Sequence, residues 1–336
     1  MGVSIGAAIA VNKIGFDLVG NPLPMEIQSY IEDSSINVDG ALTLDAHADQ
    51  KIDAVVLAGS VAVAGGQTGV AVSGSGVFVF NQIGANVNAY IIGDATDGDT
   101  EIIEAGSISI HASDDSVINT TAGAASAAVA VGQTGVAVSI GAAVAVNEIS
   151  TSVDAYINNM GDGLTADQTE IINPVTGATR IIGDIVVNAE QNAEINAISS
   201  AASIALGFGQ AGIAVSGAGA GATNYILTNT NASIENSKIL NADAIDIDAI
   251  NSSAISAVVV AASAACGGGQ VGVGASIGVS VARNLIGYRL GAAGVTTYKT
   301  GDTSIMGGQF QFGNTVLVDG GINDGDVYEY IGPGGA

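Results

Sequence analysis

Apolar residues recur along much of this chain with a period of two, which is the spacing expected of β-strands. The stretch VGQTGVAVSIGAAVAVN at 131–147 is the clearest apolar tract, since it holds neither a charged nor an aromatic residue. Glycine interrupts such tracts and β-branched residues are frequent, and both features disfavour helices. The pattern therefore predicts an all-β protein.

Near-copies of this stretch recur as a cassette of fixed length. Four copies align without gaps at 66–81, 132–147, 209–224 and 269–284, and in each a glutamine precedes an asparagine by 14 positions. A fifth, truncated copy ends at Asn12. Successive asparagines are 69, 66, 77 and 60 residues apart, so connectors of variable length separate the cassettes. Internal repetition of this kind is typical of proteins built from stacked units.

Two further elements accompany the cassette. Before it lies an alternating run of Ile, Leu and Val, then polar residues, then a second alternating run, as in GSISIHASDDSVINTTAGAAS at 106–126. After it comes a shorter alternating segment, such as SVDAYINNM at 152–160. We interpret the polar residues between the two alternating runs as a turn. The whole unit then predicts strands joined at corners rich in Gly, Asn and Asp.

Both faces of the cassette strands are apolar or small, which is typical of strands that are buried on both sides. The central GGQTG or VGQTG predicts a tight turn, because Gly adopts positive φ at little steric cost. Each cassette should therefore form two strands around this turn, with one face packed inward and the other against a neighbouring layer. We also expect the repeated amides to form ladders inside the protein. The repeat positions are Gln67, Gln133, Gln210, Gln270, Asn12, Asn81, Asn147, Asn224 and Asn284.

These repeats predict a β-solenoid of irregular units, 60–77 residues long, with a two-layered stack of antiparallel β-hairpins as the alternative. The repeat region covers 1–290 and has cassettes that end near 12, 81, 147, 224 and 284. Residues 291–336 are Gly-rich and should begin a different module. Because the first cassette is truncated and no basic segment or cleavage pattern precedes it, we expect an excised fragment without its signal peptide.

Charge and composition narrow the classes of partner. The formal net charge is −25, so the surface should repel nucleic acid and anionic lipid headgroups. The apolar content of 48% is mostly Ala, Val and Ile, with no Trp, which favours thin layers of small side chains. We interpret Cys266, the single cysteine, as a small hydrophobe.

A membrane helix is not expected at 127–146, because this apolar tract contains Gln133 and several glycines and has no basic flank. A membrane-inserting hairpin stays open as an alternative, since each cassette arm has about the length of a barrel strand.

Little in the sequence indicates catalysis. The two histidines, His47 and His111, lie in LDAHAD and SIHASD, which we align at one repeat position where other copies have Asn188 and Asp248. This exchange indicates exposed turn residues rather than a catalytic base or a metal ligand. No Ser–His–Asp set, zinc spacing, P-loop or dinucleotide fingerprint occurs. The chain is therefore not expected to be an enzyme.

Clusters of Gly and Asp are the only candidates for a metal site. Calcium takes six to eight oxygen ligands, but these clusters match neither an EF-hand loop nor a calcium-roll repeat. We expect solvated turns and no cofactor, and we keep five residues as calcium candidates. They are Asp94, Asp97, Asp99, Asp324 and Asp326.

The run ASIENSKILNADAIDIDAINSSAISAVVVAASAACGGGQVGVGASIGVSVARNLIG at 232–287 resembles the repeats of very large bacterial surface proteins. These are filamentous-haemagglutinin-like and leukotoxin-type filamentous adhesins. The segment GNTVLVDGGINDGDVYEYIG at 313–332 is similar to linkers of the same proteins. The resemblance implies a right-handed parallel β-helix, export to the cell surface and an adhesive or filament-forming role. It supplies no catalytic residues, and the irregular repeat spacing departs from haemagglutinin-type repeats.

The leading hypothesis is a structural shaft or fibre-forming segment of a large bacterial cell-surface adhesin that assembles with itself, end to end or laterally, through strand stacking. The alternatives are an adhesin module that binds a glycan or receptor of a host or neighbouring cell, and a membrane-inserting toxin segment. No nucleic acid partner is expected.

Overall fold

All the secondary structure described here is β. The computed structural model describes residues 1–17, 19–93, 103–160, 164–166 and 183–287, and three short strands at 297–299, 315–317 and 327–329. Across these residues no helix is long and apolar enough to span a bilayer. The prediction of an all-β protein is therefore confirmed.

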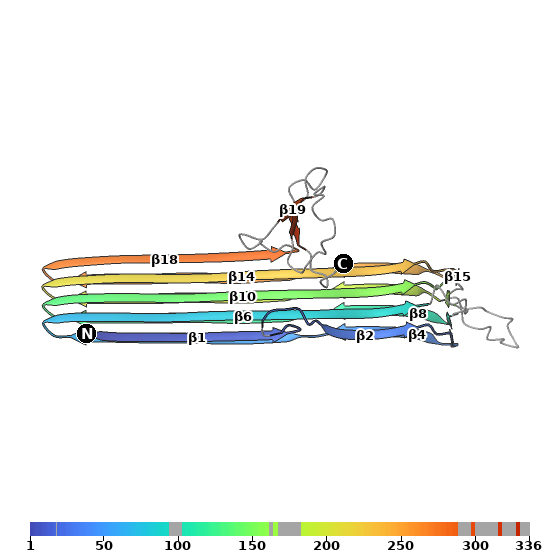
Figure 1. Cartoon of the computed structure of the whole chain (residues 1–336), viewed down its shortest axis with the longest axis horizontal. Helices are drawn as coiled ribbons and strands as arrows, with labels where there is room; N and C mark the ends of the chain where they lie inside the picture. The colour runs from blue at the N-terminus through green and yellow to red at the C-terminus, as the bar shows by residue number, and fades with distance from the viewer. Residues whose placement is uncertain are drawn as a thin grey trace, which may run out of the picture.

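The longest strands form one parallel sheet, which we call the long sheet. Its order is β1 (Gly2–Ile14), β6 (Thr68–Ile92), β10 (Thr134–Asn158), β14 (Ala211–Glu235) and β18 (Val271–Ile286), with β2 (Met25–Glu32) beside the second half of β6. Equivalent cassette residues lie side by side, so that Asn147 pairs with both Asn81 and Asn224. Figure 1 shows these strands running straight and nearly parallel across the molecule.

Three shorter parallel sheets form the return path of the chain. The tip sheet contains β5 (Lys51–Gly65), β9 (Val117–Val131), β13 (Glu194–Phe208) and β17 (Ala254–Gly268). The base sheet contains β4 (Ala41–Ala48), β8 (Ser107–Asp114), β12 (Ile185–Gln191) and β16 (Ile245–Asn251). The third contains β3 (Ile36–Asn37), β7 (Ile103–Ala105), β11 (Leu164–Ala166) and β15 (Ile239–Asn241). A separate small sheet pairs β20 (Thr315–Leu317) in parallel with β19 (Thr297–Lys299) and antiparallel with β21 (Val327–Glu329).

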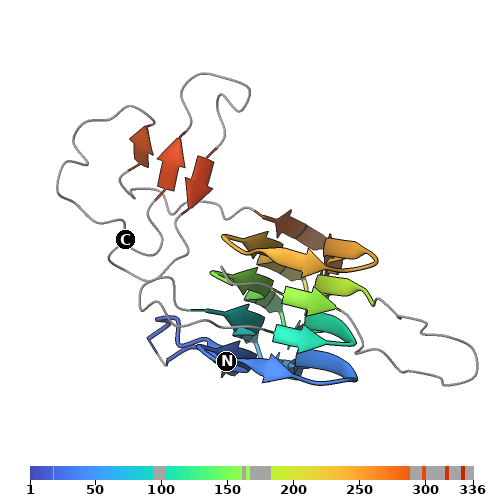
Figure 2. The same ribbon diagram turned by 90° about the vertical axis from the view of Figure 1, so that its right-hand side faces the viewer.

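One coil of the chain runs along a long strand and returns through the shorter sheets. Thus β6 is followed by β7, β8 and β9, and then by β10, which pairs with β6. Figure 2 shows the successive coils stacked above one another. The two cassette strands flank a turn as expected, but they do not pair with each other. β5 pairs in parallel with β9, and β6 pairs in parallel with β1 and β10, so the antiparallel hairpin alternative is wrong.

The polar residues between the two alternating runs do not reverse the chain. They are a short break between β8 and β9, and both strands lie along the same long strand. Contacts of β10 across the core show this order. Gln191, before the equivalent break between β12 and β13, contacts Thr151, whereas Ser126, after the break between β8 and β9, contacts Ser139. The interpretation of this segment as a turn is therefore corrected. It is a break within one broad face of the coil.

The core has two zones of different composition. Near the cassette turns, which we call the tip, one cluster of fully or nearly buried residues contains only alanines. Behind the base sheet the largest cluster is rich in isoleucine and includes Ile91, Ile110 and Ile157. The sheets approach closely near the tip, where a Cβ added at Gly141 would lie 2.7 Å from the Ala202 carbonyl oxygen. The small side chains expected from the composition thus set a thin core at the tip.

Candidate assembly surfaces

A ladder of five asparagines runs through the interior along the stacking direction. Its members are Asn12, Asn81, Asn147, Asn224 and Asn284. In each of the four links, one Nδ2 donates to the Oδ1 of the next asparagine at 2.8 Å. The three central members are fully buried. A side-chain amide both donates and accepts hydrogen bonds. Asparagines at the same position of successive coils can therefore satisfy each other's hydrogen-bonding groups.

The four glutamines occupy a different environment. Gln67, Gln133, Gln210 and Gln270 are exposed in the cassette turns and lie outside the core. Their backbone, rather than their side chain, joins the coils. The carbonyl of Gln67 accepts from the amide of Thr134 at 3.0 Å, and that of Gln133 accepts from Ala211 at 3.0 Å. The expected internal amide ladder is therefore made by the asparagines.

Paired serines cross the core and were not anticipated from the sequence. Each pair joins a long strand to the tip-sheet strand that precedes it. The pairs are Ser60–Ser73 (2.7 Å), Ser126–Ser139 (2.7 Å), Ser203–Ser216 (2.9 Å) and Ser263–Ser276 (2.7 Å). A signal for them exists, because both serines occupy fixed places in every complete repeat. They fix the alignment of the two sheets as the asparagines fix the alignment of the coils.

A buried polar network occupies the break between the base and tip sheets. The carboxylate of Asp114, which is fully buried, accepts from Ser116 Oγ at 2.6 Å and from Gln191 Nε2 at 2.6 Å. Gln191 in turn accepts from Thr151 Oγ1 at 3.1 Å, and Gln50 accepts from Ser116 at 2.9 Å. Each buried polar group named here has a partner, as burial of polar atoms requires.

The two histidines do not share one repeat position. His111 lies beside Asp45 and Asn188, and Asn188 lies beside Asp248, but His47 pairs with Ser113 instead. The alignment of His47 with His111 is therefore wrong by two residues. His111 Nδ1 contacts the Asp45 carboxylate at 3.0 Å, and His47 Nδ1 contacts Ser113 Oγ at 2.8 Å. Both side chains sit within rows of neighbouring polar groups.

The calcium candidates Asp94, Asp97, Asp99, Asp324 and Asp326 all lie outside the described residues. Within the part of the chain that is described, no group of three His, Cys, Asp or Glu side chains is placed to hold a metal ion.

Both broad outer faces are apolar near the tip, and both are exposed. On the tip sheet, Val55 is 71% exposed and Leu57 is 68% exposed. On the long sheet, Ile5 is 82%, Ile140 is 57% and Ile277 is 70% exposed. Among the described residues no further layer covers these outer faces, so the expectation that neighbouring layers cover both sides of the cassette strands is wrong for this part of the chain. The inner side chains are packed, and the outer ones face solvent.

Toward the base sheet the outer faces become polar. Tyr30, Tyr90 and Tyr156 stack across neighbouring strands, with ring centroids 5.1 and 4.9 Å apart. Burial, and after it the charge of Glu32, raises the pKa of Tyr90. Burial likewise raises the pKa of Tyr156. The rings face each other and so leave their edges to solvent, an arrangement that links coils.

An exposed amide row marks the border between the apolar and polar halves of the tip sheet. Asn119 Nδ2 donates to Asp53 Oδ1 at 2.7 Å, and Asn196 Nδ2 donates to Asn119 Oδ1 at 3.1 Å. The bond from Asn119, and secondarily Lys51, lowers the pKa of Asp53. The fourth member of the row is Ser256 on β17.

The stack has two ends. The long sheet ends at β1 and β18, and the tip sheet ends at β5 and β17, so these strands have one sheet neighbour each among the described residues. Cys266, on β17, is exposed rather than packed as a core hydrophobe.

No family model matches the chain, and neither the curated proteins nor the solved structures contain a match.

Proposed function

We propose that the described part of the chain is a parallel β-solenoid that serves as a structural shaft or fibre-forming segment of a large bacterial surface adhesin. The observation that carries this proposal is the in-register stacking of unequal repeats. The connectors change the repeat length between 66 and 77 residues, yet the asparagine links on either side stay at 2.8 Å. The equivalent long strands pair in the same register across both repeats.

Stacking of this kind suits a load-bearing rod. β10 pairs with β6 along its whole length, from Thr134 to Asn158, and it pairs with β14 over the same residues. Separating two coils would require many backbone hydrogen bonds to break together, because each coil contacts its neighbours along the full width of the stack. The asparagine ladder and serine pairs oppose sliding, since a slipped register would leave buried polar groups unpaired.

The ends of the stack provide the route to a fibre. Edge strands carry unpaired backbone groups and readily accept another strand. If β17 of one copy met β5 of the next in the register found within the chain, Ser256 would lie beside Asp53 of the next copy. Within one copy these two positions are three strands apart, about 14 Å. A substitution at Ser256 can therefore alter the contact with Asp53 of the next copy without affecting Asp53 of the same copy.

The experiment combines negative-stain microscopy with two substitutions of Ser256. Rods that lengthen along the stacking direction with concentration are expected for the native chain. Ser256→Asp should shorten them, because like charges on neighbouring strands repel. Ser256→Lys serves as the matched control and should preserve the rods, and Asp53→Lys combined with Ser256→Asp should restore them. Native chain that stays as single particles at all concentrations would refute the fibre-forming role.

A further inference from the structure

The outer face of the tip sheet is flat, uncharged and apolar over a wide area. We call the outward positions from Val55 to Gly65, with their partners on β9, β13 and β17, the tip face. It contains no charged residue. Eleven residues on each of four strands span about 36 Å by 19 Å, or roughly 700 Å². Soluble monomers rarely expose apolar patches larger than a few hundred Å².

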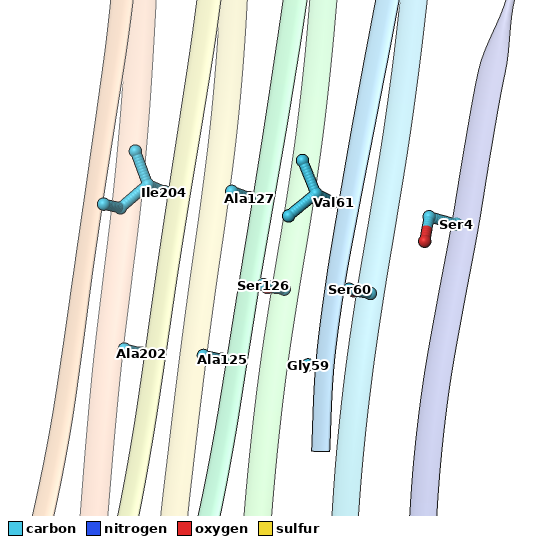
Figure 3. A pocket seen from close by; sticks show the side chains of 9 residues that line it. All are labelled: Ser4, Gly59, Ser60, Val61, Ala125, Ser126, Ala127, Ala202 and Ile204. Carbon is cyan, nitrogen blue, oxygen red and sulfur yellow. The ribbon is translucent and has the colours of Figure 1, made fainter.

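A groove of small residues crosses the tip face along the stacking direction. It is the row Gly59, Ala125, Ala202 and Ala262. Figure 3 shows the first three of these beside Val61, Ala127 and Ile204. These six residues also line a hollow of about 440 Å³, which they share with Ser4, Ser60 and Ser126 from the inner side of the sheets.

Rows of larger side chains lie on both sides of the groove, four residues away. One ridge is Val63, Val129, Leu206 and Cys266, and the other is Val55, Thr121, Ile198 and Val258. Ridge and groove are thus about 13 Å apart along the strands. A second tip face placed against the first can seat its ridge in this groove, as inner faces of packed sheets interdigitate.

The outer face of the long sheet repeats the same relief. On β1, β6, β10 and β14 a small row, Ala7, Gly76, Ala142 and Gly219, runs parallel to a row of valines, Val3, Val72, Val138 and Val215. The relief ends at β18, where the two rows continue as Val279 and Ala275. Each broad side of the coil stack therefore offers a groove, with two ridges on the tip face and one on the long sheet.

We propose that further copies of this chain cover both broad faces, so that the flat stacks pack side by side as well as end to end. The tip face approaches the area of about 800 Å² that each partner of a standard interface buries. Flat sheets of many strands are uncommon, and stacking against other sheets is one cause of flatness. Gly and Ala in the grooves permit close approach of two sheets, whereas they would offer lipid chains little contact. The chain also has no Trp for a membrane interface.

The lateral contact is separable from the end joint on which the proposed fibre rests. Ala202 lies in the groove of the tip face, and Ala142 lies in the groove of the long sheet, and both are exposed. An arginine at either site places an unpaired charge in one lateral interface and leaves the Ser256 row unchanged. Ser109→Arg adds the same charge to the outer side of the base sheet, outside both grooves.

Sedimentation velocity on the full chain carrying Ser256→Asp, which removes the end joint, tests the lateral contact alone. Without a further change, or with S109R, this chain should form stacks wider than a dimer. A202R and A142R should each stop at face-to-face dimers, and the double variant should lose lateral association, weakened by about 100-fold or more, because burying an unpaired charge is costly. Circular dichroism should stay native for all variants, since each substituted side chain points outward.

Cys266 provides a second readout because it lies on a ridge of the tip face. Its maleimide labelling should be slower in the assembled native chain than in A202R. A native chain that shows no lateral association, or a double variant that associates as the native chain does, would overturn the proposal. So would a chain that floats with neutral phosphatidylcholine vesicles and loses this binding in A202R, because lipid would then cover the face. If S256D loses the rods but keeps the lateral stacks, the end joint and the lateral contact are distinct.

Discussion

Replacing Asn147 by alanine tests whether the asparagine ladder holds the stack together. Asn147 is fully buried and makes three side-chain hydrogen bonds. It donates to Asn224 Oδ1 at 2.8 Å and accepts from Asn81 Nδ2 at 2.8 Å and from Thr120 Oγ1 at 2.7 Å. In Asn147→Ala, Asn81 still donates to Thr120, but the Asn224 oxygen and the Thr120 hydroxyl proton each lose a partner.

The magnitude follows from these two orphaned groups. A buried polar group left unsatisfied costs about 1–3 kcal/mol, so the two groups together should lower the free energy of unfolding by about 2–6 kcal/mol. Asn12→Ala is the matched control, because Asn12 is only partly buried and makes one link, to Asn81. Its loss leaves one buried group, Asn81 Oδ1, without this donor and should cost about 1–3 kcal/mol, roughly half the cost of Asn147→Ala.

Urea unfolding followed by circular dichroism measures both variants against the native chain at one protein concentration. The two variants should differ by more than about 1 kcal/mol, with unchanged spectra before unfolding. If Asn147→Ala and Asn12→Ala lowered the stability equally, the central asparagine would not be a self-satisfying core residue. The inference that the ladder fixes the register would then fail.

Two further predictions concern packing and pH. Gly141→Ala should destabilise the chain by about 1–3 kcal/mol, because the new Cβ would lie 2.7 Å from a backbone carbonyl oxygen. Gly76→Ala on the outer side should be nearly neutral, because its new Cβ would have nothing within 4 Å. Urea unfolding compares the two variants. The raised pKa values of Tyr90 and Tyr156 favour the protonated folded state, so their contribution is intact below the ordinary value of 10.0 and is lost as pH rises through the raised values. The melting temperature should therefore fall more steeply above pH 10 in the native chain than in Y90F/Y156F, and equal slopes would contradict this reasoning.

The sequence predicts both the strands and their stacking, because the repeat carries a regular pattern for each. Period-two alternation defines which side chains face inward, and the constant distance from Gln133 to Asn147 within a cassette defines which strands can pair in register. The asparagine ladder was predictable for this reason. The serine pairs were equally regular, but pairing them requires knowing that the tip sheet lies opposite the long sheet.

The break at Asp114 and the relative placement of the histidines were harder to predict. A short polar segment between apolar runs can reverse the chain or merely interrupt a strand. The choice depends on the length of the strand opposite, here β10, against which the buried network of Asp114, Gln191 and Thr151 forms. The segments LDAHAD and SIHASD share a histidine, but the two histidines are not equivalent. The backbone register places His111 beside Asp45 instead.

The exposed apolar faces show a limit of pattern analysis for a single chain. Apolar residues on both sides of a strand predict that both sides are buried, and this chain buries one. In the described residues, the path of a coil supplies one inner layer, between the long sheet and the return strands. A second layer on the outer side would have to come from outside the coil stack, which is the physical basis of the lateral contact proposed above.

The thin core at the tip leads us to predict that local stability differs between the tip and the base. Around Ala71, Ala137 and Ala214 the core contains only alanines, while the base half buries residues such as Ile91 and Ile157. Burial stabilises in proportion to apolar area, so a lone copy should open at the tip before the base. Amide hydrogen exchange should show weaker protection at 71–79 than at 83–91 in the A202R/A142R variant, which has no lateral partner. In the laterally assembled native chain the outer valines and isoleucines at the tip should also be buried, and the difference should narrow. Equal protection of both halves in the A202R/A142R variant would mean that the backbone ladders alone hold the tip, and that it needs no lateral partner for stability.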